Sequence, residues 1–140
     1  MNAFSLHILT AFKPFFDGKC LSLVVPTPSG MYGIQAKHSD FVGSIVPGEM
    51  KITCEEDGEI KVITAAVADG IVRVEGGDVL VLADTVERAE EIDENRAQAA
   101  YEKALEDSAQ QRSVREYYAA QARLARAVNR LKVKRHTIKR

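Results

Sequence analysis

The stretch that decides the fold is V-L-V-L-A-D-T-V-E-R-A-E-E-I-D-E-N-R-A-Q-A-A, which runs from Val79 to Ala100. It begins as an apolar run of the kind found in strands and ends as an alanine-rich, charged segment of the kind found in surface helices. Asp84 and Glu87 have the three-residue spacing of a capping box. The sequence therefore predicts a helix that begins near Thr85.

Before this stretch, apolar and polar residues alternate with the two-residue period of β-strands. Asp57-Gly58 separates two such segments and predicts a hairpin, because a type I′ turn needs positive φ at both central residues. Gly76-Gly77 predicts a second hairpin in the same way. Frequent turns between short strands predict an all-β sandwich or barrel over residues 1–84.

After this stretch, the chain becomes helical in character. It has no proline or glycine from Thr85 to Arg140, and alanine is common. Polar residues around Asp107 predict a connection, and Ser113 with Glu116 forms a second capping signature. A heptad-like apolar seam follows at Val114, Tyr117, Gln121, Leu124, Val128 and Leu131. Residues 85–140 are therefore expected to form an α-helical hairpin of two antiparallel helices.

The composition narrows the class of protein. The chain has 140 residues, of which 46% are hydrophobic and 28% charged, as is typical of a globular protein. Its longest apolar runs are too short to cross a bilayer, and no export signal is expected at the N-terminus. Two cysteines without a C-x-x-C motif predict buried, reduced thiols, and three scattered histidines predict no metal site. No set of nucleophile and base is present, so no catalytic residue is predicted and an enzyme is not expected.

Charge is strongly segregated along the chain, although the net charge is only −1. Residues 1–83 carry six basic and ten acidic side chains, and residues 84–107 carry three basic and nine acidic ones. Residues 108–140 carry ten basic side chains and one acidic side chain. The two predicted helices therefore either pair with each other, or the basic one meets an anionic partner.

A group of charged side chains is expected where the two helices meet. In an antiparallel hairpin the late part of the second helix approaches the start of the first, which would gather Glu87, Ile92, Asp93, Arg96, Arg126 and Arg130. Guanidinium groups bind phosphate oxygens through two hydrogen bonds, and a carboxylate accepts from an amine or a ribose hydroxyl, so this set suits a nucleotide. An exposed network of ion pairs, each worth about 0–1 kcal/mol, explains the same residues. Periodicity alone does not separate these two interpretations.

The basic C-terminus, K-V-K-R-H-T-I-K-R, raises the question of nucleic-acid binding. Aromatic residues do not alternate with these cations, and no nucleic-acid-binding fold is indicated. We therefore expect no nucleic-acid partner.

Nearly the whole chain resembles the epsilon subunit of the bacterial F-type ATP synthase, the small subunit of the central rotor. The resemblance is carried by F-D-G-K-C-L-S-L-V-V-P-T-P-S-G-M-Y-G-I, I-V-P-G-E-M-K-I, D-G-I-V-R-V-E-G-G-D-V-L-V-L-A-D-T-V-E-R-A-E-E-I-D and A-R-A-V-N-R-L-K-V. It implies an all-β N-terminal sandwich followed by an α-helical hairpin, and a non-catalytic regulatory role.

The resemblance also implies a nucleotide site. Some bacterial epsilon subunits bind ATP through the pattern Ile or Leu, Asp, two variable residues, Arg, Ala, which residues 92–97 match in full. ATP would be a regulatory ligand that is not hydrolysed and needs no metal. The residues implied around the base and ribose are Glu87, Ile92, Asp93 and Ala97, and those at the phosphates are Arg96, Arg126 and Arg130. Lys103 stands where a further arginine is common, which keeps the charge but loses the bidentate fork.

The partners implied by the resemblance are the other subunits of a proton-translocating ATP synthase. In the family the sandwich contacts the gamma subunit and the c-ring, and the extended helices insert between the alpha and beta subunits and block ATP hydrolysis. His38 stands in the loop that faces the c-ring, although Gln35-Ala36-Lys37 replaces the usual leucine-proline-glycine before it. The expected location is the cytoplasmic face of the cell membrane, as a peripheral subunit. The alternative for the hairpin is structural coupling without nucleotide sensing.

Overall fold

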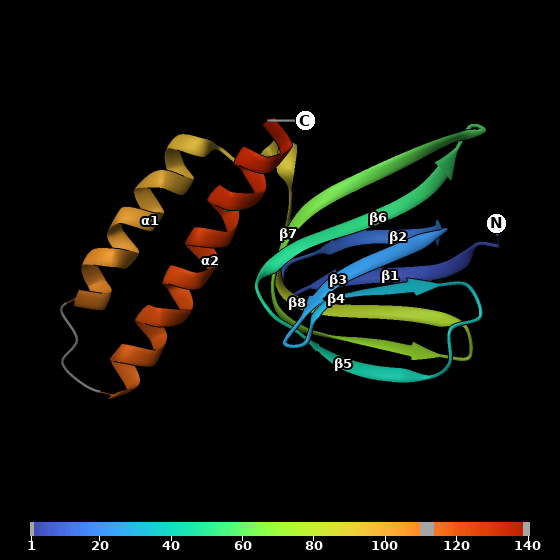
Figure 1. Ribbon diagram of the computed structural model, residues 1–140, viewed down its shortest axis with the longest axis horizontal. Helices are drawn as coiled ribbons and strands as arrows, with labels where there is room; N and C mark the ends of the chain where they lie inside the picture. Colours follow the sequence, from blue (N-terminus) through green and yellow to red (C-terminus); the bar gives the residue numbers. More distant parts are fainter. Residues whose placement is uncertain (1, 110–113, 139–140) are drawn as a thin grey trace. The chain divides into compact units, whose positions relative to one another are not determined.

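The computed structural model describes residues 2–109 and 114–138. Eight strands are followed by a short 3-10 helix and two α-helices (Figure 1). The elements are β1 (Phe4–Thr10), β2 (Pro14–Cys20), β3 (Ser22–Thr27), β4 (Gly30–Gln35), β5 (Phe41–Ile45), β6 (Gly48–Glu56), β7 (Glu59–Glu75), β8 (Asp78–Arg88), η1 (Ala89–Glu91), α1 (Glu94–Ala109) and α2 (Val114–Ile138). The chain divides into two compact units, Met1–Arg88 and Ala89–Arg140. The predicted fold class, a β-sandwich followed by two helices, is confirmed.

The first unit is built around the long strand β7. The hydrogen-bonded order is β2-β1-β8-β7-β6-β3-β4, and β5 also pairs with β7. β7 pairs with β6 over its first part, up to Val67 opposite Gly48, and with β5 over its second part, from Gly70 opposite Ile45. A strand that changes partner in this way lets the sheet fold over itself into two layers.

Both predicted hairpins are present. Asp57 and Gly58 have φ of 54° and 78°, and they join β6 to β7. Gly76 and Gly77 have φ of 58° and 85°, and they join β7 to β8. Positive φ at both central residues is the geometry of a type I′ turn, whose twist matches that of the strands on either side.

The inward faces of the strands form one apolar core, as the two-residue period predicts. Its largest fully buried side chains include Leu6, Ile8, Leu23, Ile34, Met50 and Ile52. Both cysteines belong to this core and are free, which confirms the prediction of buried thiols. Burial, and secondarily the neighbouring Cys54, raises the pKa of the Cys20 thiol from 9.0 to about 12.

The predicted start of the first helix near Thr85 is wrong. β8 continues to Arg88, because its last four residues pair with residues 65–68 of β7, from Thr85 opposite Ala68 to Arg88 opposite Ala65. The ladder satisfies the backbone of this segment, and the β-branched residues Thr85 and Val86 favour a strand. Helix α1 begins only at Glu94.

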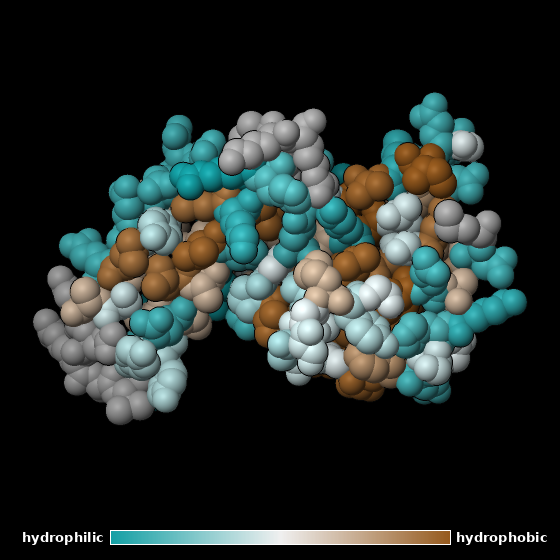
Figure 2. All heavy atoms as spheres, viewed as in Figure 1, coloured by the Kyte–Doolittle hydropathy of each residue, from teal (hydrophilic) through white to brown (hydrophobic). Residues whose placement is uncertain are grey.

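The second unit is a hairpin of α1 and α2, which pack against each other along small side chains. Ala97 and Ala104 are the buried residues of α1. On α2 the corresponding face contains Ala120, Ala127 and Leu131. Alanine lets two helices approach closely while burying little area. Figure 2 shows apolar side chains along the visible face of this unit, bordered by hydrophilic ones.

The predicted seam of α2 is therefore partly wrong. Leu131 is buried as expected, but Tyr117 and Val128 are exposed. Ala127 is buried in place of Val128, and Ala120 is the nearest buried residue to Tyr117 among those described, so that alanines rather than larger side chains face α1. Ser113 of the second predicted cap lies outside the described residues.

No described helix combines the length and the apolar character needed to span a membrane. Within the described ranges, no group of three or more His, Cys, Asp or Glu residues is arranged to hold a metal ion.

Gly70 gives a direct test of the partner change in β7. A Cβ added there would overlap the backbone of Leu82 and Ala83 in β8, which cannot move without breaking the ladder. We expect Gly70→Ala to lower the free energy of unfolding by about 2 kcal/mol in urea denaturation. The matched control is Gly33→Ala, where nothing lies within 4 Å of the added carbon and a change within about 0.5 kcal/mol is expected. Equal stability of the two variants would contradict this account of the β7–β8 contact.

Candidate nucleotide site and docking loop

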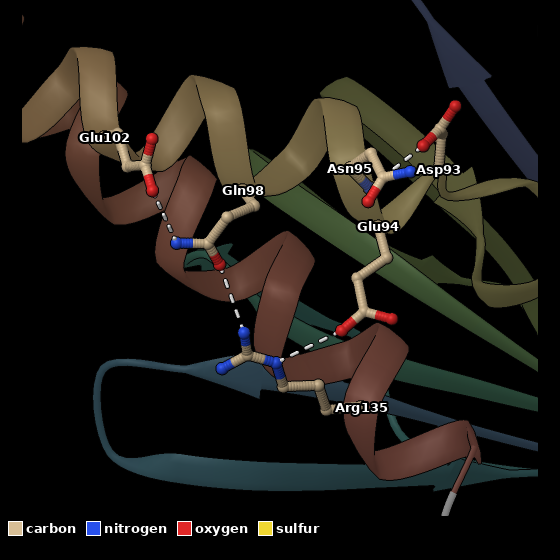
Figure 3. Close-up of polar contacts among 6 residues, drawn as sticks. All are labelled: Asp93, Glu94, Asn95, Gln98, Glu102 and Arg135. Carbon is tan, nitrogen blue, oxygen red and sulfur yellow. Dashed lines mark hydrogen bonds and ion pairs between the residues drawn. The ribbon is translucent and has the colours of Figure 1, made fainter.

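Asp93 caps the N-terminus of α1. Its Oδ1 accepts a hydrogen bond from the backbone N–H group of Asn95, at 3.0 Å (Figure 3). It also accepts one from the backbone N–H group of Arg96, at 3.2 Å. The first N–H groups of a helix have no partner within the helix, so a carboxylate at this position stabilises the helix end. On either side of the cap, Ile92 and Ala97 are buried, with exposed fractions of 2% and 0%. The six-residue pattern thus has a structural role at the helix start.

Arg135 of α2 contacts α1 near the N-terminal end of α1. Its Nε lies 3.4 Å from Oε1 of Glu94, and its Nη2 donates to Oε1 of Gln98 at 3.1 Å (Figure 3). Gln98 in turn donates to Glu102 one helical turn further along α1. Lys134 also donates to the carbonyl oxygen of Ala89, at 3.2 Å. These contacts fix the register of the two helices.

Sequence analysis missed Arg135 and Lys134. Their signal was present, because Glu94, Gln98 and Glu102 recur every four residues and form a polar row that a cation of the opposite helix can contact. The expected ion pairing between the helices is therefore present on this row, between Arg135 and Glu94.

The register places Arg126 and Arg130 further from the start of α1 than the sequence suggested. At about 1.5 Å per residue, Arg130 lies about 7.5 Å and Arg126 about 13.5 Å from the level of Arg135. Lys103 lies about 10.5 Å beyond Arg96 along α1, at a level between these two arginines. The contacts at the level of Glu94 are made by Arg135 instead.

The cations of α1 share one side of that helix. Each residue advances the helix by about 100°, so residues seven apart lie on the same face. Arg96 and Lys103 are seven apart and exposed, and they lie on one side of the seam formed by Ala97 and Ala104. Glu94 and its polar row lie on the other side.

The arginines of α2 fall on the same side of the hairpin as these cations. On α2, Arg126 and Arg130 lie on one side of the seam through Ala127 and Leu131, and Arg135 lies on the other. Since Arg135 contacts the polar row of α1, the remaining arginines share the opposite side with Arg96 and Lys103. We call this side the basic flank; it comprises Arg96, Lys103, Arg123, Arg126 and Arg130. Arg126 and Arg130 are half-buried, and each has an interaction partner.

Glu87, the remaining residue expected near the base and ribose, lies on β8 in the first unit. It stands opposite Ala66 of β7 and is half-buried. It is therefore a strand residue rather than a residue of the first helix, because β8 is longer than predicted.

His38 lies in a loop between β4 and β5 that is organised by aromatic contacts. Its Nε2 lies 2.8 Å from the hydroxyl of Tyr32, and its Nδ1 lies 2.7 Å from the carbonyl oxygen of Ser39. The Tyr32 ring stacks on Phe41 with centroids 4.6 Å apart. Both ring nitrogens of His38 are therefore engaged, and the imidazole is held in a fixed orientation.

Lys37, just before His38, has a φ of 65°. This left-handed conformation favours glycine and costs other residues about 1 kcal/mol. Glycine is the residue that the resemblance leads us to expect at this position. The turn is thus retained in this chain despite the replacement by Gln35-Ala36-Lys37.

Comparison with known proteins assigns both units to one class, the delta/epsilon subunits of ATP synthase. Residues 3–89 match the β-sandwich domain of the ATP synthase delta/epsilon chain, and residues 90–135 match its long alpha-helix domain. The chain therefore belongs to the ATP synthase delta/epsilon chain family.

Individual members of this family are similar to this chain over nearly its whole length. The chain is 41% identical over 134 residues to the ATP synthase epsilon chain of Ruminococcus albus, which covers 95% of this chain and 97% of the relative. It is 35% identical over 131 residues to that of Ruminiclostridium cellulolyticum, covering 94% and 95%. The resemblance to epsilon subunits is thereby confirmed, and membership of this family agrees with a non-catalytic role.

A solved structure shows the same fold at low sequence identity. A chain of the mitochondrial ATP synthase of Euglena gracilis aligns with a TM-score of 0.75 at 18% identity, over 99% of this chain and 82% of that chain.

The cap at Asp93 yields a stability prediction. Asp93→Ala leaves two N–H groups at the start of α1 without their acceptor, and we expect it to destabilise the hairpin by about 1 kcal/mol. Asp93→Asn keeps an acceptor oxygen and is the matched control, with a change of a few tenths of a kcal/mol at most. Urea titration followed by far-UV circular dichroism measures both. Indistinguishable losses in the two variants would show that the cap does not stabilise α1.

Proposed function

We propose that this chain is an epsilon-type subunit in the central stalk of a proton-translocating F-type ATP synthase. The observation that carries the proposal is that one family accounts for the sandwich and the hairpin together, in the same order and over residues 3–89 and 90–135. In this role the sandwich binds the gamma subunit and the c-ring, and the loop with His38 contacts the ring. The chain would be a peripheral subunit at the cytoplasmic face of the membrane.

The hairpin is proposed to be the regulatory part. α1 buries only alanines among its described residues, and each buried methyl group contributes about 0.8 kcal/mol. The contacts that Arg135 makes between the helices are exposed, and such pairs contribute about 0–1 kcal/mol. Two helices held this weakly can separate, and separated helices can insert between the alpha and beta subunits and block ATP hydrolysis.

ATP is proposed as the ligand that keeps the hairpin closed. The basic flank gathers cations from both helices, so an anion bound there would link α1 to α2. Ile92, Asp93 and Ala97 at the start of α1 would contact the base and ribose, Glu87 is proposed with them, and Arg96, Lys103, Arg126 and Arg130 would hold the phosphates. At free ATP ten times its dissociation constant, binding only to the closed form adds about 1.4 kcal/mol. This free energy raises the ratio of closed to open hairpins about tenfold.

A second function is favoured by one observation. Asp93 already accepts two backbone hydrogen bonds, and Arg135 already pairs the helices without any ligand. These contacts suit a purely structural hairpin that couples the rotor to the catalytic head without sensing nucleotide.

Titration calorimetry of ATP into the isolated protein separates the two functions. We expect saturable binding at one site, weakened at least tenfold by Arg126→Ala, because a charge-assisted contact with phosphate contributes about 1.5–3 kcal/mol. The matched control is Lys132→Ala, an exposed cation of the same helix that lies outside the basic flank, for which affinity should change less than about threefold. Loss of affinity in both variants, or in neither, would reject the basic flank as the phosphate site. Absence of binding would favour the structural function.

The inhibitory role has its own test. Added to an F1 assembly that lacks its epsilon subunit, the chain should lower the ATP hydrolysis rate at micromolar ATP and inhibit less at millimolar ATP, where the closed hairpin is more populated. Inhibition that is absent, or that does not depend on ATP concentration, would contradict the proposed regulation.

A further inference from the structure

The two cysteines meet in the core of the first unit, although 34 positions separate them in the sequence. Cys20 is the last residue of β2, and Cys54 lies near the end of β6. Both belong to the same cluster of buried side chains, with exposed fractions of 1% and 8%. Neither is explained by the docking or regulatory roles proposed above.

Extending the backbone register of β3 and β6 brings the two cysteines next to each other. Ser22 pairs with Thr53, and Leu23 pairs with Ile52. The N–H of Leu21 also donates to the carbonyl oxygen of Thr53, at 2.7 Å. Leu21 and Ser22 therefore both oppose Thr53, which is the arrangement of a β-bulge. Extended past this bulge, the register has Cys20 opposite Cys54 as the next pair outward, and β2 and β6 are in contact.

Directly opposed residues on antiparallel strands meet the distance requirement of a disulfide. Residues directly opposite each other on antiparallel strands have Cα atoms about 4.5–5.5 Å apart, with both side chains on the same face. Disulfides usually join Cα atoms about 4.4–6.8 Å apart. The two thiols also interact electrostatically, since Cys54 contributes to the raised pKa of Cys20.

The end of the β6–β7 hairpin provides a route to the buried thiols. Residues 55–62, which immediately follow Cys54, are all exposed, and Ile60 and Val62 have exposed fractions of 58% and 54%. Figure 1 shows this end of β6 and β7 projecting from the rest of the sheet. Because this segment buries few side chains, it can open locally without unfolding the core. Cys54 is then the first thiol to become accessible.

We infer that Cys20 and Cys54 form a dithiol site that closes to a disulfide by exchange with a low-molecular-weight disulfide, RSSR. The Cys54 thiolate attacks one sulfur of RSSR, forms a mixed disulfide and releases one RSH after protonation. The Cys20 thiolate then attacks the Cys54 sulfur and releases the second RSH. The protein loses two electrons and two protons, and RSSR gains them. The product links the end of β2 to β6.

The test is the equilibrium with oxidised and reduced glutathione, measured on the full chain in native buffer and in denaturing urea. Thiols are quenched with acid, and the closed form is counted by intact mass and by a Cys20–Cys54 peptide link. The native fold already holds the two residues opposite each other, so we expect the equilibrium constant for closure to be at least about tenfold larger in the native chain. The equilibrium is approached from the reduced chain and from the chain oxidised before refolding, so that slow access to the buried thiols does not prevent a result.

Cys20→Ser and Cys54→Ser are matched controls, and each should stop at a mixed disulfide on the remaining thiol. An equilibrium constant that is the same or smaller in the native chain would overturn the inference, because the fold would then oppose the bond. A mixed disulfide at Cys54 that persists in the wild-type chain would also overturn it.

Discussion

The hydrogen bonds that the backbone N–H groups of Asn95 and Arg96 donate to Asp93 fix the arrangement of the second unit. They determine where α1 begins, and hence which of its residues face α2. With α1 beginning at Glu94, its alanines form the seam and its polar row faces Arg135. With the same helix start, Arg96 and Lys103 lie on the side of α1 opposite to the polar row. A start one or two residues earlier or later would turn each of these faces away from its partner by about 100° or 160°.

The hairpin combines a weak apolar seam with a concentration of like charge. Alanines bury little area, and the basic flank gathers five cations on one side of the hairpin. An anionic ligand bound at the basic flank would therefore stabilise the hairpin, whose apolar seam contributes little by itself. This is the physical basis for expecting a small ligand to shift the equilibrium between closed and open helices, whereas the sandwich, with its large continuous core, remains folded in both states.

Much of the fold could be predicted from local signals. Asp57-Gly58 and Gly76-Gly77 specify their turns through positive φ, which is a property of the residues themselves. The end of β8 could not be predicted, because Asp84 and Glu87 satisfy a helix-capping pattern while residues 85–88 pair with residues 65–68, about 20 positions earlier in the sequence. The seam of α2 was misjudged at Tyr117 and Val128, because large side chains carry more weight in a periodicity argument than the alanines that actually pack.

Several of the candidate site residues could be identified from sequence patterns. Their arrangement in space could not, because it depends on the register of the two helices. Residues 92–97 form a recognisable pattern, and the arginines of α2 are evident from their spacing. The level of Arg126 and Arg130 relative to α1 depends on Arg135 and Lys134, whose partners are set by the packing of the helices. Likewise, nothing in the spacing of two cysteines indicates that a bulge at Leu21 brings them opposite each other.

The most direct test of the central claim is amide hydrogen exchange of the isolated protein with and without ATP. If ATP binds the closed hairpin, exchange should slow in α1 and α2 together, by a factor that rises with ATP concentration, while the strands of the sandwich remain unchanged. Unchanged exchange in both helices at saturating ATP would contradict the claim that the hairpin is a nucleotide-dependent switch.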